Sequence, residues 1–190
     1  MKSGVLKDLP IRYKFALVVS SGALYWGSFE LNKILFDDLL FVERVHWIYI
    51  PAGIRLILVL LFFELGALGI LLGALCLNYV YYFNGEHLFA IGTSMLAAAS
   101  PWLARYLSVS WLKMDLNLRG LTNDMLLKVS LLFAVLSSCL IQGWFYWNGK
   151  TDSFWMAASV MAVGKWLGTV LVLAILRMLL KLAPILMSRD

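Results

Sequence analysis

Residues 47–82 read WIYIPAGIRLILVLLFFELGALGILLGALCLNYVYY and carry the strongest structural signal in the chain. Two apolar runs follow each other, separated only by Glu64, Leu65 and Gly66. Each run has about 18 residues, which at ~1.5 Å per residue approaches the ~30 Å hydrocarbon core of a bilayer. The stretch predicts a transmembrane helical hairpin with helices at residues 47–65 and 66–83.

The composition of the whole chain indicates an integral membrane protein. Of the 190 residues, 62% are hydrophobic and 14% are charged, and the mean hydropathy is +0.84. A soluble domain of this size cannot hide so much apolar surface, because ordinary domains are only about half apolar. The net charge of +5 is read as the basic bias of cytoplasmic segments. We therefore expect the lipid bilayer as a partner and no nucleic acid.

Four further helices are expected, at residues 15–35, 88–107, 124–147 and 153–182. The first lacks a credible cleavage site, so it is read as a retained helix and not a signal peptide. Residues 108–123 are read as an interfacial amphipathic segment. The predicted fold is all-α: one integral membrane domain over residues 1–190 with six transmembrane helices.

The distribution of basic residues gives the expected orientation. Eleven of the sixteen lysines and arginines fall on the side that carries both termini, and three fall on the other side. Because basic residues are enriched in cytoplasmic segments, both termini are predicted to be cytoplasmic. The predicted location is the inner, cytoplasmic membrane of a bacterium, with several crossings.

Polar residues inside the predicted helices are the candidate ligand-binding residues: Glu30, Arg55, Asn78, Gln142 and Lys165. Charges inside a bilayer cost several kcal/mol unless they are paired or face water. In one reading Glu30 pairs with Arg55, and the surplus positive charge forms an outward-facing pocket for an anionic or carbonyl-bearing small molecule. In the other, the five residues form a structural network that fixes helix register. A path for ions or protons is disfavoured, because no series of intramembrane carboxylates continues from Glu30 to the cytoplasm.

The sequence contains no catalytic set. Ser137, Ser138 and Ser159 lack an intramembrane histidine as a base, so we expect no enzyme. Cys76 and Cys139 are read as buried packing thiols, and no spacing suits a metal. No cofactor and no metal are predicted.

Two further patterns concern packing. The pairs Gly69–Gly73 and Gly164–Gly168 allow close helix approach, and packing within one chain is favoured over dimerisation. Aromatic residues gather at the predicted outer side, among them Trp47, Tyr49, Tyr82, Phe83 and Phe145. They fit an interfacial belt or, alternatively, the walls of an outward cavity.

The hairpin resembles the first-described bacterial membrane-associated sensor domain family. Pro51-Ala52-Gly53-Ile54 is similar to its P-x-G helix, and residues 69–78, GILLGALCLN, are similar to its G-x-x-x-G-A-L-x-x-N helix. Phe154-Trp155 and residues 164–168, GKWLG, are similar in placement to a later helix, although Lys165 stands where the family tends to have Asp.

The resemblance implies an integral membrane sensory domain. The family usually has about eight helices and a cytoplasmic output domain such as a diguanylate cyclase or histidine kinase, whereas a free-standing relative is expected here. The leading hypothesis is a sensory or ligand-binding module that signals through a protein partner in the membrane. The alternatives are a substrate-binding component of a small-molecule transporter and a non-catalytic assembly subunit of a larger membrane complex.

Overall fold

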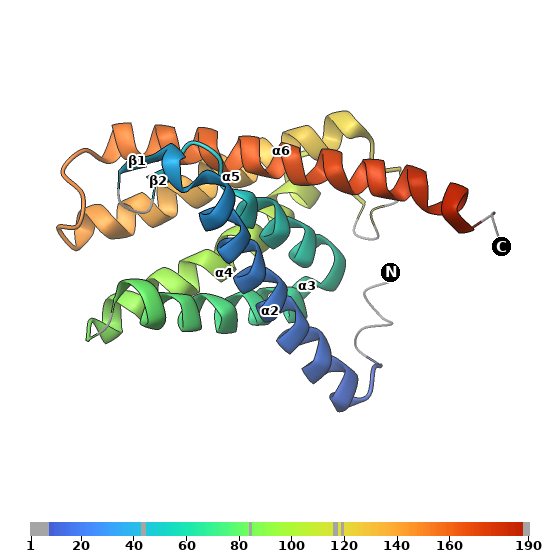
Figure 1. Cartoon of the computed structure of the whole chain (residues 1–190), viewed down its shortest axis with the longest axis horizontal. Helices are drawn as coiled ribbons and strands as arrows, with labels where there is room; N and C mark the ends of the chain where they lie inside the picture. The colour runs from blue at the N-terminus through green and yellow to red at the C-terminus, as the bar shows by residue number, and fades with distance from the viewer. Residues whose placement is uncertain (1–7, 43–44, 84, 116–117, 119, 188–190) are drawn as a thin grey trace.

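A computed structural model describes residues 8–42, 45–83, 85–115, 118 and 120–187. In this part of the chain five α-helices form the body of the molecule (Figure 1). The prediction of an all-α fold is confirmed. The helices are α2 (Ile11–Phe36), α3 (Ile50–Leu77), α4 (His87–Trp111), α5 (Asn123–Trp147) and α6 (Phe154–Met187), and the π-helix η2 (Asn78–Tyr82) continues α3.

The ends of the predicted helices shift. The helix expected at 15–35 begins at Ile11, and the one expected at 153–182 extends to Met187. The helix expected at 88–107 runs on to Trp111, so the start of the supposed interfacial segment is helical. An apolar pattern locates a helix, but local hydrogen bonds set its ends.

The connection between α2 and α3 has structure that the sequence did not predict. A 3-10 turn, η1 (Asp37–Leu39), precedes two short antiparallel strands, β1 (Leu40–Val42) and β2 (Val45–His46). Asn32 is a buried residue of α2, and its Oδ1 accepts a hydrogen bond from the backbone N–H of Ile50 at 2.8 Å. This bond satisfies one of the free N–H groups at the start of α3 and ties the two helices together.

The predicted break within the central stretch lies at Phe63, one residue before Glu64. Phe63 has φ 55° and ψ −126°, so α3 is two helical arms that meet at a sharp bend. A Cβ at Gly66 would lie 2.3 Å from the carbonyl oxygen of Leu58, which means that only glycine fits there. Arg55 and Asn78 line one pocket, although a straight helix would place them roughly 35 Å apart. The arms therefore fold back on each other.

Three segments of the described chain are long and apolar enough to cross a membrane: Ile50–Tyr82, Asn123–Trp147 and Phe154–Leu182. Each exposes large apolar side chains on the outside of the bundle, for example Leu68, Leu131 and Leu167. Such exposure suits lipid as the surrounding solvent, and these features suggest a membrane protein. The prediction that Cys76 and Cys139 are buried is wrong, because both lie on exposed faces of these helices.

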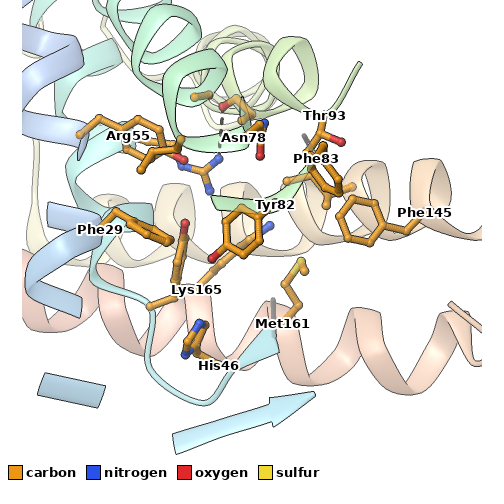
Figure 2. Close-up of a pocket in the computed structure, with 16 residues that line it drawn as sticks. Phe29, His46, Arg55, Asn78, Tyr82, Phe83, Thr93, Phe145, Met161 and Lys165 are labelled. Carbon is orange, nitrogen blue, oxygen red and sulfur yellow. Dashed lines mark hydrogen bonds between the residues drawn. The ribbon is translucent and has the colours of Figure 1, made fainter. Parts of the chain in front are cut away.

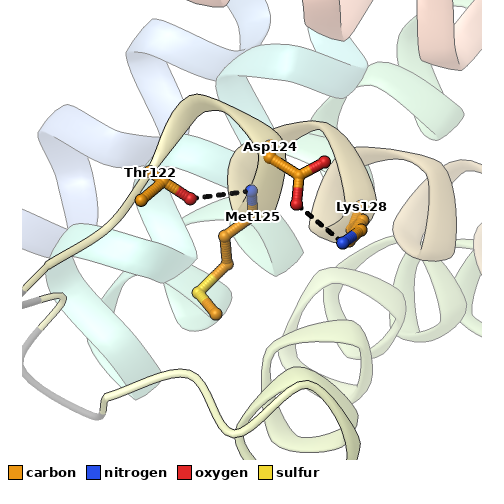
Figure 3. A network of polar contacts seen from close by, with 4 residues as sticks. All are labelled: Thr122, Asp124, Met125 and Lys128. Atoms are coloured by element: carbon orange, nitrogen blue, oxygen red, sulfur yellow. Dashed lines mark hydrogen bonds and ion pairs between the residues drawn. The ribbon is translucent and has the colours of Figure 1, made fainter.

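Helix α5 begins at Asn123, one residue earlier than expected, and local interactions stabilise its first turn (Figure 3). The hydroxyl of Thr122 accepts a hydrogen bond from the backbone N–H of Met125 at 3.2 Å, which is the usual N-cap arrangement. Asp124 and Lys128 form an ion pair at 2.6 Å one turn apart.

Both small-residue pairs make close contacts within this chain, as predicted. A Cβ at Gly69 would lie 2.4 Å from Cβ of Ser21 on α2, and one at Gly164 would lie 1.9 Å from the carbonyl oxygen of His46. The N–H of Tyr49 also donates a hydrogen bond to the carbonyl oxygen of Gly164 at 3.0 Å. Because Gly164 and Gly168 have no side chains, the segment between β2 and α3 packs directly against the backbone of α6.

Candidate functional site

A cavity of about 90 Å³ lies inside the bundle, where both arms of α3 meet α4, α5, α6 and strand β2 (Figure 2). Its cationic side chains are Arg55 and Lys165, and no Asp or Glu is among its lining residues in the described part of the chain. Aromatic rings form much of the wall: Tyr25, Phe29, Tyr49, Tyr82, Phe83 and Phe145.

Arg55 is 1% exposed and projects from the first arm of α3 into the pocket. Its Nη1 donates a hydrogen bond to the carbonyl oxygen of Ala97 at 3.3 Å, whereas Nε and Nη2 have no hydrogen-bond partner among the described residues. The guanidinium carbon lies 5.8 Å from the ring centroid of Tyr25 and 5.6 Å from that of Phe133. A buried guanidinium is costly unless its donors are satisfied, so two donors remain available for a ligand.

Lys165 is 3% exposed and approaches the pocket from α6. Its Nζ donates a hydrogen bond to the hydroxyl of Ser137 on α5 at 2.9 Å. An ammonium group has three donors, so this contact leaves capacity for a ligand. The pocket therefore holds a second buried basic side chain.

Asn78 joins the second arm of α3 to α4. Its Nδ2 donates to the hydroxyl of Ser94 at 2.7 Å and to the carbonyl oxygen of Ala90 at 3.5 Å, and the Ser94 hydroxyl in turn donates to Ala90 at 2.7 Å. Asn78 lines the pocket, as does Thr93, whose buried hydroxyl has no hydrogen-bond partner among the described residues.

Gln142 lies close to the pocket but is not a lining residue. It is 2% exposed, and its Nε2 lies 3.8 Å from Sδ of Met161, which does line the cavity. Its Oε1 is buried without a hydrogen-bond partner in the described chain. Gln142 therefore supports the wall.

Glu30 lies away from the pocket, and its expected pairing with Arg55 is wrong. Its Oε1 accepts hydrogen bonds from Nε1 of Trp26 at 2.9 Å and from the hydroxyl of Tyr81 at 2.6 Å. Trp26 is one turn earlier on α2, so the two side chains share a face that points toward Tyr81 and not into the bundle. The five predicted residues thus divide into Arg55, Asn78 and Lys165 at the pocket, Gln142 beside it and Glu30 outside.

The pocket also contains residues that the sequence did not assign to a site. His46 is 9% exposed, lines the cavity and stacks on Tyr49 with centroids 6.0 Å apart. Both residues belong to the segment before α3 that packs on Gly164 and Gly168 of α6, so their positions depend on a long-range contact. The aromatic signal was visible in the sequence, and Tyr49, Tyr82, Phe83 and Phe145 do line the cavity.

Compared with known proteins, the chain matches no family model, no curated protein and no solved structure. The resemblance of the hairpin to the sensor-domain family stays a prediction.

Proposed function

We propose that this protein is a membrane-embedded module that binds an anionic small molecule and passes its bound state to a protein partner, as a sensory domain does. The observation that carries this proposal is the pair of buried cations, Arg55 and Lys165, in a cavity with no acidic lining residue in the described chain. Two buried positive charges without a counter-ion are unfavourable, and a bound anion relieves that cost.

A structural network explains the pocket less well. A network that fixes helix register satisfies its own donors, as Asn78 does with Ser94. Arg55 instead keeps Nε and Nη2 without hydrogen-bond partners in the described chain, beside a cavity. This arrangement favours a binding role, and the proposal includes no enzymatic activity.

The proposed topology has six crossings, with both termini in the cytoplasm of a bacterium. The bend at Phe63 supports two crossings within α3 and η2. Helices α2 and α4 also expose large apolar side chains, such as Phe15, Leu24, Met95 and Trp102. In Figure 1 the start of α4 and the end of α5 lie at one end of the molecule, and the bend within α3 and the end of α4 lie at the other. The pocket then opens toward the non-cytoplasmic side.

Native mass spectrometry on protein extracted from its own membranes tests the proposal. We expect wild-type protein to carry a small anionic molecule that the Arg55→Leu variant lacks, while Arg177→Leu retains it because Arg177 is exposed on α6. Equal ligand content in wild type and Arg55→Leu would contradict the proposal. Co-purification of a signalling protein supports the sensory role, whereas ligand uptake dependent on an ATPase would reassign the protein to transport.

A further inference from the structure

We infer that the ligand is a small monocarboxylate with an apolar body, held with its carboxylate against Arg55 and Lys165 and its body against Phe83, Phe145 and Met161. This inference rests on the proposed function and narrows it to one chemical class. It follows from the free donors of Arg55, the placement of charge along the pocket and the size of the cavity.

The free donors of Arg55 suit a carboxylate. Nη1 is occupied by the carbonyl oxygen of Ala97, and the two groups without a partner in the described chain are Nε and Nη2. These two N–H groups lie side by side on one edge of the planar guanidinium. They match the spacing of two carboxylate oxygens, which accept a pair of parallel hydrogen bonds. Lys165 adds a second positive charge in the same pocket.

The charge lies at one end of the pocket. On α5, Ser137, Ile141 and Phe145 follow one another at four-residue intervals, so they share a face and are spaced about 6 Å apart. Ser137 binds Lys165, whereas Ile141 and Phe145 line the cavity farther along. Figure 2 shows Phe83 and Phe145 on the side of the pocket opposite to Arg55.

The far end of the pocket carries no charged lining residue in the described chain, and Thr93 contributes one hydroxyl group there. The rings of Phe83 and Phe145 stand edge to face with centroids 6.5 Å apart, and Met161, one turn before Lys165 on α6, also lines this region. A second carboxylate placed there would lose its hydration without gaining a cation, which is unfavourable. This uncharged end therefore selects a monoanion over a dianion.

The cavity volume limits the size of the ligand. One buried water needs roughly 10–15 Å³ of such volume, so a cavity of about 90 Å³ holds about six to nine waters or a ligand with about that many non-hydrogen atoms. Benzoate has a single carboxylate, an apolar ring and this size. It is therefore a suitable probe of the class.

Calorimetry on protein in lipid nanodiscs tests the inference. We expect benzoate to bind, its neutral isostere benzamide to bind at least tenfold more weakly, and the dianion isophthalate and the small anion acetate to bind more weakly than benzoate. Arg55→Gln and Lys165→Gln should each weaken benzoate at least tenfold, with Arg177→Gln and Lys150→Gln as controls on exposed residues. Met161→Gln should weaken benzoate more than acetate.

The possible failures are distinguishable. Tighter binding of isophthalate, acetate or inorganic phosphate than of benzoate, with dependence on Arg55, would overturn the monocarboxylate inference and leave the anion-binding function intact. Absence of binding by every anion, or benzoate binding unchanged in Arg55→Gln, would overturn both. If the Arg55→Gln protein does not fold, the comparison of benzoate with benzamide on wild-type protein still decides the role of charge.

Discussion

The two ends of the α3 hairpin each hold a buried arginine, and the two arginines have different surroundings. At the closed end, the guanidinium carbon of Arg105 from α4 lies 3.7 Å from the ring centroid of Phe63, the residue at the bend. At the open end, Arg55 is more than 5 Å from the nearest ring centroids and faces a cavity. The closed end is packed, whereas the open end leaves room for a ligand.

This difference shows that depth in an apolar helix does not by itself define a binding residue. Arg105 is 7% exposed and Arg55 is 1% exposed, so burial barely separates them. What separates them is the surroundings of each guanidinium, which are the ring of Phe63 for Arg105 and a cavity for Arg55. We therefore expect changes at the closed end to alter stability and changes at the open end to alter ligand binding.

The largest effect is expected at the bend, from Gly66→Ala. The added methyl group would meet the carbonyl oxygen of Leu58 at 2.3 Å, so the arms must separate. We expect a loss of about 3 kcal/mol in the free energy of unfolding, measured by denaturant titration in detergent micelles. Gly27→Ala is the matched control, because a Cβ there meets nothing within 4 Å. Equal stability of the two variants would contradict the tight hairpin.

The next effect is expected at the open end, from Arg55→Gln. Loss of a charged hydrogen-bond pair should weaken carboxylate binding by about 2 kcal/mol, roughly thirtyfold in Kd, without lowering the free energy of unfolding. Calorimetry in nanodiscs measures the affinity. Arg105→Gln serves as the control from the other end of the hairpin and should change the affinity less than twofold. A similar loss of affinity in both variants would remove the distinction between the ends.

A smaller effect is expected from Arg105→Gln on stability. The stacked guanidinium is buried against Phe63, and such a contact contributes about 1–2 kcal/mol when it is shielded from water. Thermal unfolding followed by circular dichroism should show a lower midpoint than in Arg55→Gln. A lower midpoint of thermal unfolding for Arg55→Gln than for Arg105→Gln would contradict this expectation.

The smallest effect is expected at the surface ion pair of Lys150 and Glu86, whose Nζ and Oε1 atoms are 2.8 Å apart. Glu86 directly precedes α4, and Lys150 follows α5. The two side chains are 36% and 48% exposed, so solvent screens the attraction. We expect Lys150→Gln to lower stability by less than about 1 kcal/mol, and added salt to reduce this difference further. A loss comparable to that of Gly66→Ala would mean that this pair holds the bundle closed.

Much of the fold was predictable because apolar runs and their interruptions are local properties of the sequence. The run at residues 47–82 predicted a hairpin, and the bend lies one residue from the expected break. The strands β1 and β2 were not predicted, since three-residue and two-residue strands leave no periodic pattern. The end of α2 lies one residue from its predicted position, whereas the hydrogen bond from Ile50 to Asn32 was not predicted because it joins two helices.

The site was predicted in part. Arg55, Asn78 and Lys165 were identified because polar residues in apolar helices stand out by composition alone. Glu30 was misassigned because sequence spacing gives depth along a helix and not the direction in which its face points. His46 was missed as a pocket residue because its position depends on the contact between its backbone and Gly164.

The amino-acid sequence indicates an apolar, helical chain, the approximate positions of its helices and the few polar side chains within them. These features follow from composition and periodicity, which do not depend on contacts between residues that are distant in the sequence. Which of those side chains meet depends on how the helices rotate and pack, and this is a property of the folded chain. Folding separates Glu30 from Arg55, brings Lys165 into the pocket with Arg55, and leaves Nε and Nη2 of this pocket-lining arginine without hydrogen-bond partners in the described chain.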